Sequence, residues 1–226
     1  MNKLNSLAAI ALSAVALLAC DSDGPAAPGG PDIVGDGQSL QSCSQALTGT
    51  FENITIQAGE ACTVRNATVN GNIKALKNAH LFVITSTVRG NIQGDEAAVV
   101  NVTGGTVDGD IQIVDGRSSG QLGASVIGTT VTGGNIQIEK MQTGSIVVSD
   151  ARVLVGNIQV VENSTSDALS VENNHTGANM QVFKNTGAGS KQVRGNTIAQ
   201  SLQCKENSIP FNAESNTAGD KEDQCA

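Results

Sequence analysis

The stretch TVRGNIQ at residues 87–93 decides the fold, because nearly the same letters recur along the chain. Its copies are TVNGNIK at 68–74, TVDGDIQ at 106–112, TGGNIQ at 132–137 and LVGNIQ at 154–159. The anchoring glycines follow at steps of 19, 19, 25 and 22 residues and are Gly71, Gly90, Gly109, Gly134 and Gly156. Weaker copies continue the series at Ala178 and Gln200. A repeat of this length is the sequence signature of a solenoid.

Each repeat predicts at least two short strands. After the anchor, apolar residues alternate with glutamine, as in Ile136-Gln137-Ile138, which is the period of a half-buried strand. A second strand is indicated by stretches such as HLFVITSTV at 80–88. The 26 glycines, the four phenylalanines and the lack of tyrosine and tryptophan fit a narrow interior of stacked isoleucine and valine. Coil length varies, whereas left-handed hexapeptide coils keep one turn length. The sequence therefore predicts an all-β, single-domain right-handed parallel β-helix over 43–226, with about eight or nine coils of 19–25 residues.

Asparagines also recur at the coil period, so they are expected to form ladders between coils about 4.8 Å apart. The first ladder lies beside the glycine anchors and comprises Asn72, Asn91, Asn135, Asn157 and Asn179. The second lies at a turn and comprises Asn163, Asn185 and Asn207. Asparagine suits such turns because it tolerates left-handed backbone and its amide can bond to the copy in the next coil. A structural role is expected for both ladders, and ligand binding is the alternative.

Stacking also predicts the disulfides. Cys43 and Cys62 are one coil apart, as are Cys204 and Cys225. Residues stacked one coil apart lie within the Cα separation that a disulfide needs, whereas the two ends of a solenoid do not meet. We therefore expect Cys43–Cys62 and Cys204–Cys225, with one bond clamping each end.

The first residues resemble a bacterial lipoprotein leader. Lys3 precedes an apolar stretch at 7–18 that ends in LLAC, which is similar to a lipobox and predicts a signal peptide over 1–19 and acylation of Cys20. Residues 20–42 are rich in Gly, Pro and Asp and predict a flexible tether. The expected location is therefore the bacterial cell envelope, on a membrane through the lipid anchor.

The repeats and the C-terminal ending carry a family resemblance. The ending contains GNT at 195–197, LQC at 202–204, NT at 216–217 and QC at 224–225. Over residues 43–225 the chain resembles right-handed parallel β-helices of the pectate-lyase-like class, and more narrowly exported bacterial proteins with GN[IV]Q coils. The resemblance implies an architecture and is almost silent on activity.

Few residues are candidates for chemistry. The β-helix enzymes of that class cut polysaccharides with clustered carboxylates, and the nearest match is Asp108, Asp110 and Asp115. However, Asp110 replaces a ladder asparagine and Asp115 falls at a turn. His80 and His175 lie in different coils and are expected to be surface or turn residues. No metal site and no cofactor are predicted.

These observations favour a non-catalytic module of the cell envelope that is structural, adhesive or binds a glycan or envelope protein. The formal net charge of −8 and scattered basic residues exclude nucleic acid as a partner. The alternative is a polysaccharide lyase or hydrolase on the same scaffold. Ice binding is less favoured, because the row Thr68, Thr87 and Thr106 is expected to break near Leu154 and His175. Any function is expected on the outward rows or in the long coil at 109–134.

Overall fold

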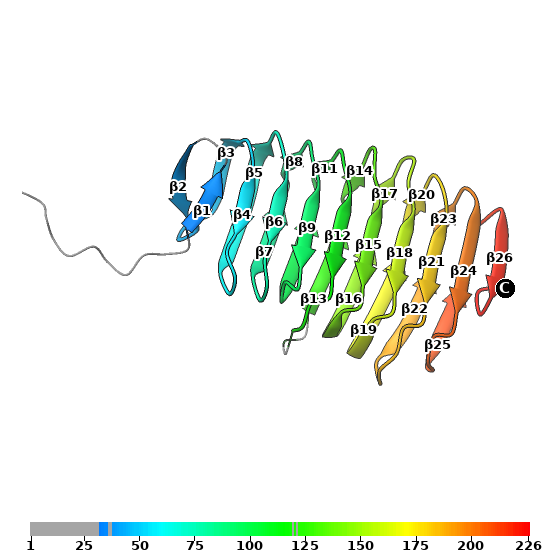
Figure 1. Ribbon diagram of the computed structural model, residues 1–226. Helices are drawn as coiled ribbons and strands as arrows, with labels where there is room; N and C mark the ends of the chain where they lie inside the picture. Colours follow the sequence, from blue (N-terminus) through cyan, green and yellow to red (C-terminus); the bar gives the residue numbers. More distant parts are fainter. Residues whose placement is uncertain (1–31, 36–37, 119, 121) are drawn as a thin grey trace, which may run out of the picture.

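The structure is a computed structural model that describes residues 32–35, 38–118, 120 and 122–226. Within these residues all elements are β-strands, wound into a parallel β-solenoid of about eight turns (Figure 1). The predicted fold class is confirmed. The predicted signal peptide, Cys20 and much of the tether lie outside the described residues, although residues 32–42 include a short antiparallel pair, β1 (Asp32–Gly35) and β2 (Gln38–Ser42). In the part of the chain that is described, no helix is long and apolar enough to cross a membrane.

Each coil contributes one strand to the first sheet. Its nine strands are parallel neighbours, because each repeats the pattern of the strand one coil before it. They are β4 (Ile54–Ile56), β6 (Ile73–Ala75), β9 (Ile92–Asp95), β12 (Ile111–Val114), β15 (Ile136–Glu139), β18 (Ile158–Val161), β21 (Met180–Phe183), β24 (Ser201–Lys205) and β26 (Asp220–Asp223).

The second sheet has 15 strands and folds around the other two sides of the coil. Its longer strands are β5 (Ala61–Val69), β7 (His80–Ile84), β10 (Val99–Thr103), β13 (Leu122–Ile127), β16 (Gln142–Ser149), β19 (Ser164–Glu172), β22 (Ser190–Arg194) and β25 (Phe211–Glu214). The third side carries β3 (Leu47–Phe51), β8 (Thr87–Val88), β11 (Thr106–Val107), β14 (Thr130–Val131), β17 (Arg152–Val153), β20 (His175–Thr176) and β23 (Thr197–Ile198).

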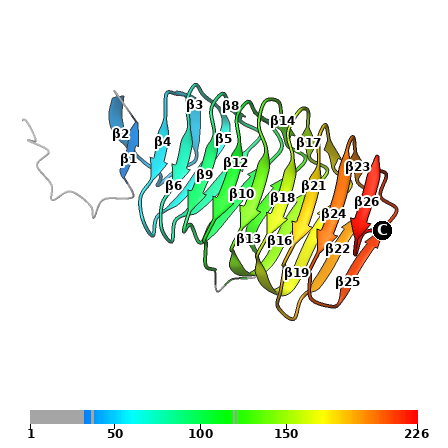
Figure 2. The same cartoon turned by 45° about the vertical axis from the view of Figure 1, so that its right-hand side comes forward.

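The solenoid therefore presents three outward faces (Figure 2). We call the outward side of the nine-stranded sheet the amide face, that of β7 to β25 the long-strand face, and that of β8 to β23 the short-strand face. The interior is filled by inward side chains that stack in register, such as Ile92 on Ile111 and Ile111 on Ile136, all of them fully buried. Stacking of the same branched side chain explains why the core needs no large aromatic residue.

A disulfide clamps each end of the stack. Cys43 bonds to Cys62 and Cys204 bonds to Cys225, with Cα separations of 5.1 and 5.2 Å. Both predicted pairings are confirmed. They hold the terminal coils, where strand edges have no neighbouring coil on one side.

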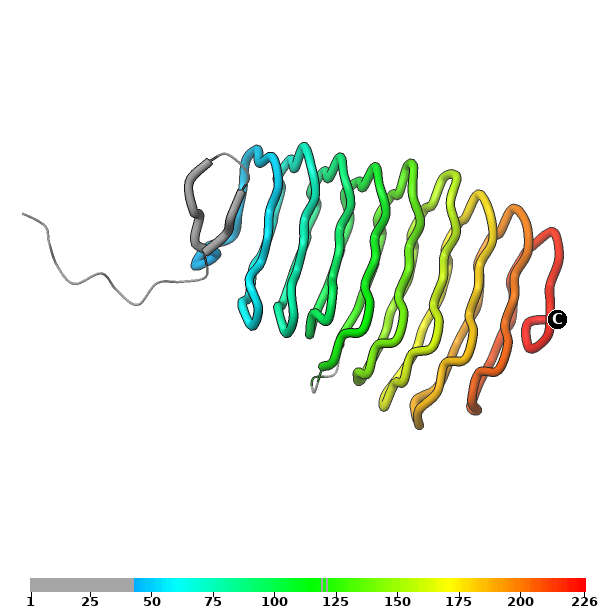
Figure 3. Tube along the Cα trace, in the orientation of Figure 1, coloured from blue at the N-terminus to red at the C-terminus, as the bar shows by residue number. Residues whose placement is uncertain are grey.

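The glycine of the repeat is required by close packing. Gly90 has an ordinary backbone angle, but a Cβ there would lie 2.5 Å from Asn72 Oδ1 and 2.6 Å from the carbonyl oxygen of Gly71. The left-handed residues lie elsewhere, mostly at two turns of each coil. One turn follows the strand of the nine-stranded sheet, as at Glu162 and Lys184 with φ of 58° and 52°. The other follows the long strand of the second sheet, as at Thr85 and Asp150 with φ of 48° and 52°. The coil lengthens from 19 to 25 residues at β12–β15, so the lower turns extend further from the fourth coil onward (Figure 3).

Candidate functional site

The second predicted ladder is buried and fully bonded. Asn163, Asn185 and Asn207 are 0%, 0% and 5% exposed. The Asn185 side chain donates to Val160 O and to Asn207 Oδ1, both at 2.9 Å, and its Oδ1 accepts from the Asn163 backbone and side-chain nitrogens. The ladder exists as predicted, but the expected left-handed backbone is wrong, because positive φ belongs to the preceding residue. With no free hydrogen-bonding group reaching solvent, this ladder is structural.

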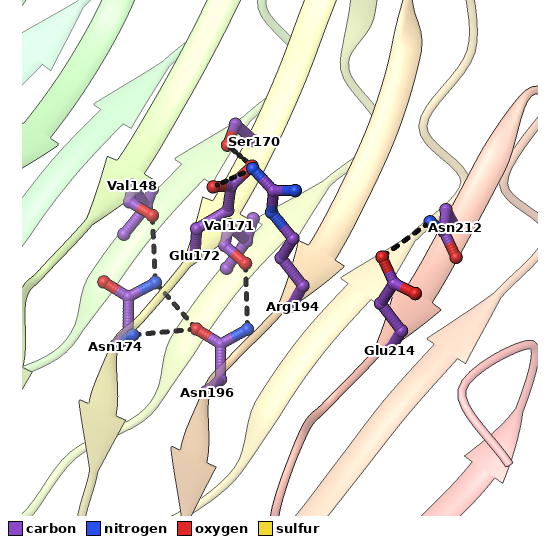
Figure 4. A network of polar contacts seen from close by, with 9 residues as sticks. All are labelled: Val148, Ser170, Val171, Glu172, Asn174, Arg194, Asn196, Asn212 and Glu214. Carbon is purple, nitrogen blue, oxygen red and sulfur yellow. Dashed lines mark hydrogen bonds and ion pairs between the residues drawn. The ribbon is translucent and has the colours of Figure 1, made fainter.

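A third ladder, which was not predicted, runs along the turn between the long-strand face and the short-strand face. Asn174, Asn196 and Asn216 are at most 8% exposed, and each bonds to the next as the second ladder does. Figure 4 shows Asn174 and Asn196 donating to the carbonyl oxygens of Val148 and Val171. The sequence signal for this ladder was the recurrence of asparagine just before the short strand of successive coils, at Asn174, Asn196 and Asn216.

The first predicted ladder is half-exposed, and its bonds between side chains end on a carboxylate. Asn179 Nδ2 donates to Asn157 Oδ1, Asn157 Nδ2 to Asn135 Oδ1, and Asn135 Nδ2 to Asp110 Oδ1 at 2.9 Å. Asn72 and Asn91 extend the row through backbone donors alone. Asp110 thus ends a chain of donors as an acceptor, which is a structural role for this catalytic candidate.

Glutamines form a parallel row two residues further on, in the middle of the amide face. Gln137 donates to Gln159, Gln159 to Gln181, and Gln181 to Gln203 at 2.7–2.9 Å, and Gln203 ends the row on the carboxylate of Glu222. Each Nε2 donates one of its two hydrogens within the row, so the other can bond to an acceptor on a ligand. The amide face therefore presents amide donors and acceptors at the coil spacing.

The two nearer candidate carboxylates are each held by a residue of the next coil. Asp108 accepts a hydrogen bond from the Thr132 hydroxyl, whereas Asp110 accepts from Asn135. Asp115 lies at the other end of β12 from Asp110, and five residues of strand span about 16 Å. Glycoside hydrolysis needs carboxyl groups about 5–10 Å apart.

Asp115 instead lines a surface hollow at one corner of the coil. We call it the corner groove, a space of about 790 Å³ along the turns that follow the nine-stranded sheet, where the coils lengthen. Lys77 pairs with Glu96 there, while Arg117 and Lys140 form no ion pair within the described residues. The groove also contains carboxylates, amides and a hydroxyl, from Asp95, Glu96, Asp115, Glu162, Asn78, Gln142 and Ser164.

A smaller hollow of about 200 Å³ lies on the amide face itself. It is lined by Gln93, Gln112 and Lys74, and it shares Asp95 with the corner groove. Amides, carboxylates and cations thus form one continuous polar surface from the middle of the sheet to its edge. The long coil was predicted as a functional region, but Arg117 and Lys140 were not among the predicted residues.

The threonine row on the short-strand face is longer than predicted. Thr130 continues Thr106 in register, and the interrupting residues are Arg152 and His175, so the expected break at Leu154 is wrong. The positions two residues before and two residues after this row hold different residue types from coil to coil. Among the described residues, no second threonine row therefore runs beside the first.

Two charged groups have shifted pKa values. Lys191 occupies the inward row, 1% exposed, with its Nζ donating to the carbonyl oxygens of Gly187 and Gly189 at 3.0 and 2.7 Å. Burial lowers the pKa of Lys191. For Glu172, burial acts to raise the pKa, but hydrogen bonds from Ser170 and Arg194 and the charge of Arg194 outweigh it, so the pKa is lowered (Figure 4). The sequence signal for the buried position of Lys191 was its place two residues before Val193 in an alternating strand.

Comparison with protein-family models, curated proteins and solved structures finds no match. The geometry of the chain therefore has to carry the functional argument.

Proposed function

We propose that the chain is a lipid-anchored protein of the bacterial cell envelope whose β-solenoid binds a polar envelope glycan without cleaving it. The observation that carries this proposal is the continuity of the amide face with the corner groove at Asp95. Glycan hydroxyls bond to amides and carboxylates. Arg117 and Lys140, which form no ion pair within the described residues, are the groove residues that would contact the charged groups of an anionic sugar.

The solenoid gives this surface a fixed pitch. The Gln row is held by its own hydrogen bonds, so its side chains are already ordered before a ligand arrives, and the entropy cost of binding is reduced. A linear polymer that repeats along its own axis is the ligand to which such a row is best matched. We place the architecture in the pectate-lyase-like class as part of the same proposal.

The binding test uses co-sedimentation of the purified protein with peptidoglycan sacculi and gel retardation in an anionic polysaccharide. We expect Arg117→Ala with Lys140→Ala to weaken retention in the anionic polysaccharide, and added salt to do the same because it screens exposed charges. Gln159→Ala should weaken both interactions. Gln192→Ala, on the long-strand face, is the matched control and should change neither.

Two results would overturn this proposal. One is equal binding by all variants or none by the unmodified protein. The other is a shortened or unsaturated glycan product that Asp110→Asn abolishes, which would establish the polysaccharide-active enzyme instead.

Anchoring has a separate test. In cells labelled with an alkyne palmitate analogue, the unmodified chain should take up label and remain with the membrane fraction. Cys20→Ala should do neither. A labelled Cys20→Ala chain would show that the lipid is attached elsewhere, and an unlabelled unmodified chain would show that the leader is an ordinary secretory signal.

A further inference from the structure

The long-strand face differs sharply between its two halves. Apolar side chains point outward from β7, β13 and β16, where Phe82, Ile84, Ile127 and Val147 are all half-buried. The later coils place polar and charged groups at the same positions, including Glu172, Arg194 and Glu214. We call the first half, from β7 to β16, the apolar patch.

The rows of this face are fixed by strand register. The row nearer the middle of the strands contains, coil by coil, Thr63, Phe82, Asn101, Ser125, Val147 and Ser170. The neighbouring row contains Arg65, Ile84, Thr103, Ile127, Ser149 and Glu172. The apolar patch occupies the inner four coils of these six, where its apolar residues are interleaved with Asn101, Thr103, Ser125 and Ser149. Its centre falls between β10 and β13, where Ser125 is buried and donates to Asn101.

Opposite charges lie at equal distances from that centre. Arg65 precedes the patch by one coil and forms no ion pair within the described residues. Glu172 follows the patch by one coil, with its side chain 17% exposed beside Arg194. A two-fold axis through the patch centre, parallel to the strands, therefore places Arg65 of one copy opposite Glu172 of another.

We propose that the apolar patch is the interface of a homodimer in which two solenoids pack face to face with antiparallel axes. The same two-fold axis sets Phe82 against Val147 and Ile84 against Ser149 of the second copy. An axis along the solenoid also covers the patch, but it pairs each coil with its own copy and leaves Arg65 without a partner. Self-complementarity about the two-fold axis is what an isologous interface requires.

The size of the interface sets the expected affinity. Six coils at about 4.8 Å and five residues at about 3.3 Å give a projected footprint of roughly 500 Å² per copy. That is below the roughly 800 Å² per partner of standard interfaces, so the dimer belongs to the weak, reversible class. Attachment of both copies to one surface would raise their effective concentration.

Cysteine cross-linking in cells tests the arrangement. In one chain Phe82 and Val147 are three coils apart, about 14 Å, which no disulfide spans. The double variant Phe82→Cys/Val147→Cys should therefore form a covalent dimer on non-reducing electrophoresis, and neither single variant should. Absence of the dimer from a folded double variant, or equal dimer from either single variant, overturns the proposal. Folding is checked by resistance of the two native disulfides to reduction.

A charge exchange tests the register by analytical ultracentrifugation of the full chain in density-matched detergent. Arg65→Glu and Glu172→Arg should each weaken the dimer by about fivefold or more, and the double variant should restore it. Glu214→Arg is the control, because it lies in the same row but outside the interface. A double variant as weak as the singles, or an equal effect of Glu214→Arg, refutes the predicted register.

Discussion

Replacing Asn185 with alanine should destabilise the solenoid far more than the same change in the half-exposed ladder. The change removes the acceptor of two buried Asn163 donors and the donor that bonds to Val160 O. The bond from the Asn185 backbone nitrogen to Asn207 Oδ1 survives. Four buried hydrogen bonds of the side chain are lost, although Asn163 Nδ2 keeps its bond to Ile138 O. At about 1 kcal/mol each, the cost should be roughly 3–5 kcal/mol.

Asn157→Ala is the matched comparison. It removes the acceptor of the Asn179 backbone and side-chain nitrogens and the donor that bonds to Asn135 Oδ1, but this ladder is half-exposed, so water replaces the lost partners and the cost should be about 1 kcal/mol. Urea unfolding followed by far-ultraviolet circular dichroism measures both free energies. Equal destabilisation by the two substitutions would refute the reasoning, because burial would then not decide the cost.

Three further predictions follow from glycine packing and from the two shifted pKa values. Gly134→Ala should cost several kcal/mol, because its Cβ would lie 2.4 Å from the carbonyl carbon of Gly109, whereas Gly128→Ala, with φ of 60° and open space, should cost only about 1 kcal/mol; comparable losses in thermal unfolding would contradict this. For Lys191, the lowered pKa means that the unfolded chain binds more protons, so unfolding midpoints should rise as pH increases toward the ordinary lysine pKa, and Lys191→Met should remove that rise. For Glu172, the lowered pKa means that its stabilisation is present above the ordinary glutamate pKa and is lost as pH falls through the folded value. The stability difference between the unmodified chain and Glu172→Gln should therefore shrink in acid, and a constant difference would argue against the bonds to Ser170 and Arg194.

The fold followed from the sequence because every level of the repeat points to the same answer. Alternation placed Ile92 and its copies inside, and the coil step then fixed the strand register and the disulfides. The backbone conformation at the turns was harder to predict. The left-handed position was assigned to Asn163 instead of Glu162, because residue type alone does not tell a side chain that needs burial from a backbone that needs positive φ.

The polar surface of the candidate site was harder still to predict. Arg117 and Lys140 are unremarkable as letters, and the corner groove arises from a change in coil length that no single motif encodes. Lys191 is the opposite case. Strict alternation with Val193 predicts a buried side chain there, although a charged residue is ordinarily expected to face solvent.

The hydrogen-bonded ladders have a direction as well as a pitch. The Gln row donates toward the C-terminus and stops on Glu222, the buried Asn163 ladder donates the same way and stops on Gln224, and the half-exposed Asn row donates the other way and stops on Asp110. Termination is thus encoded in a few acceptors, while the intervening 22-residue coils are interchangeable. Duplicating one such coil would lengthen the molecule by about 4.8 Å and leave each stop intact. The length of the solenoid can therefore change by whole coils, independently of how its ends are sealed.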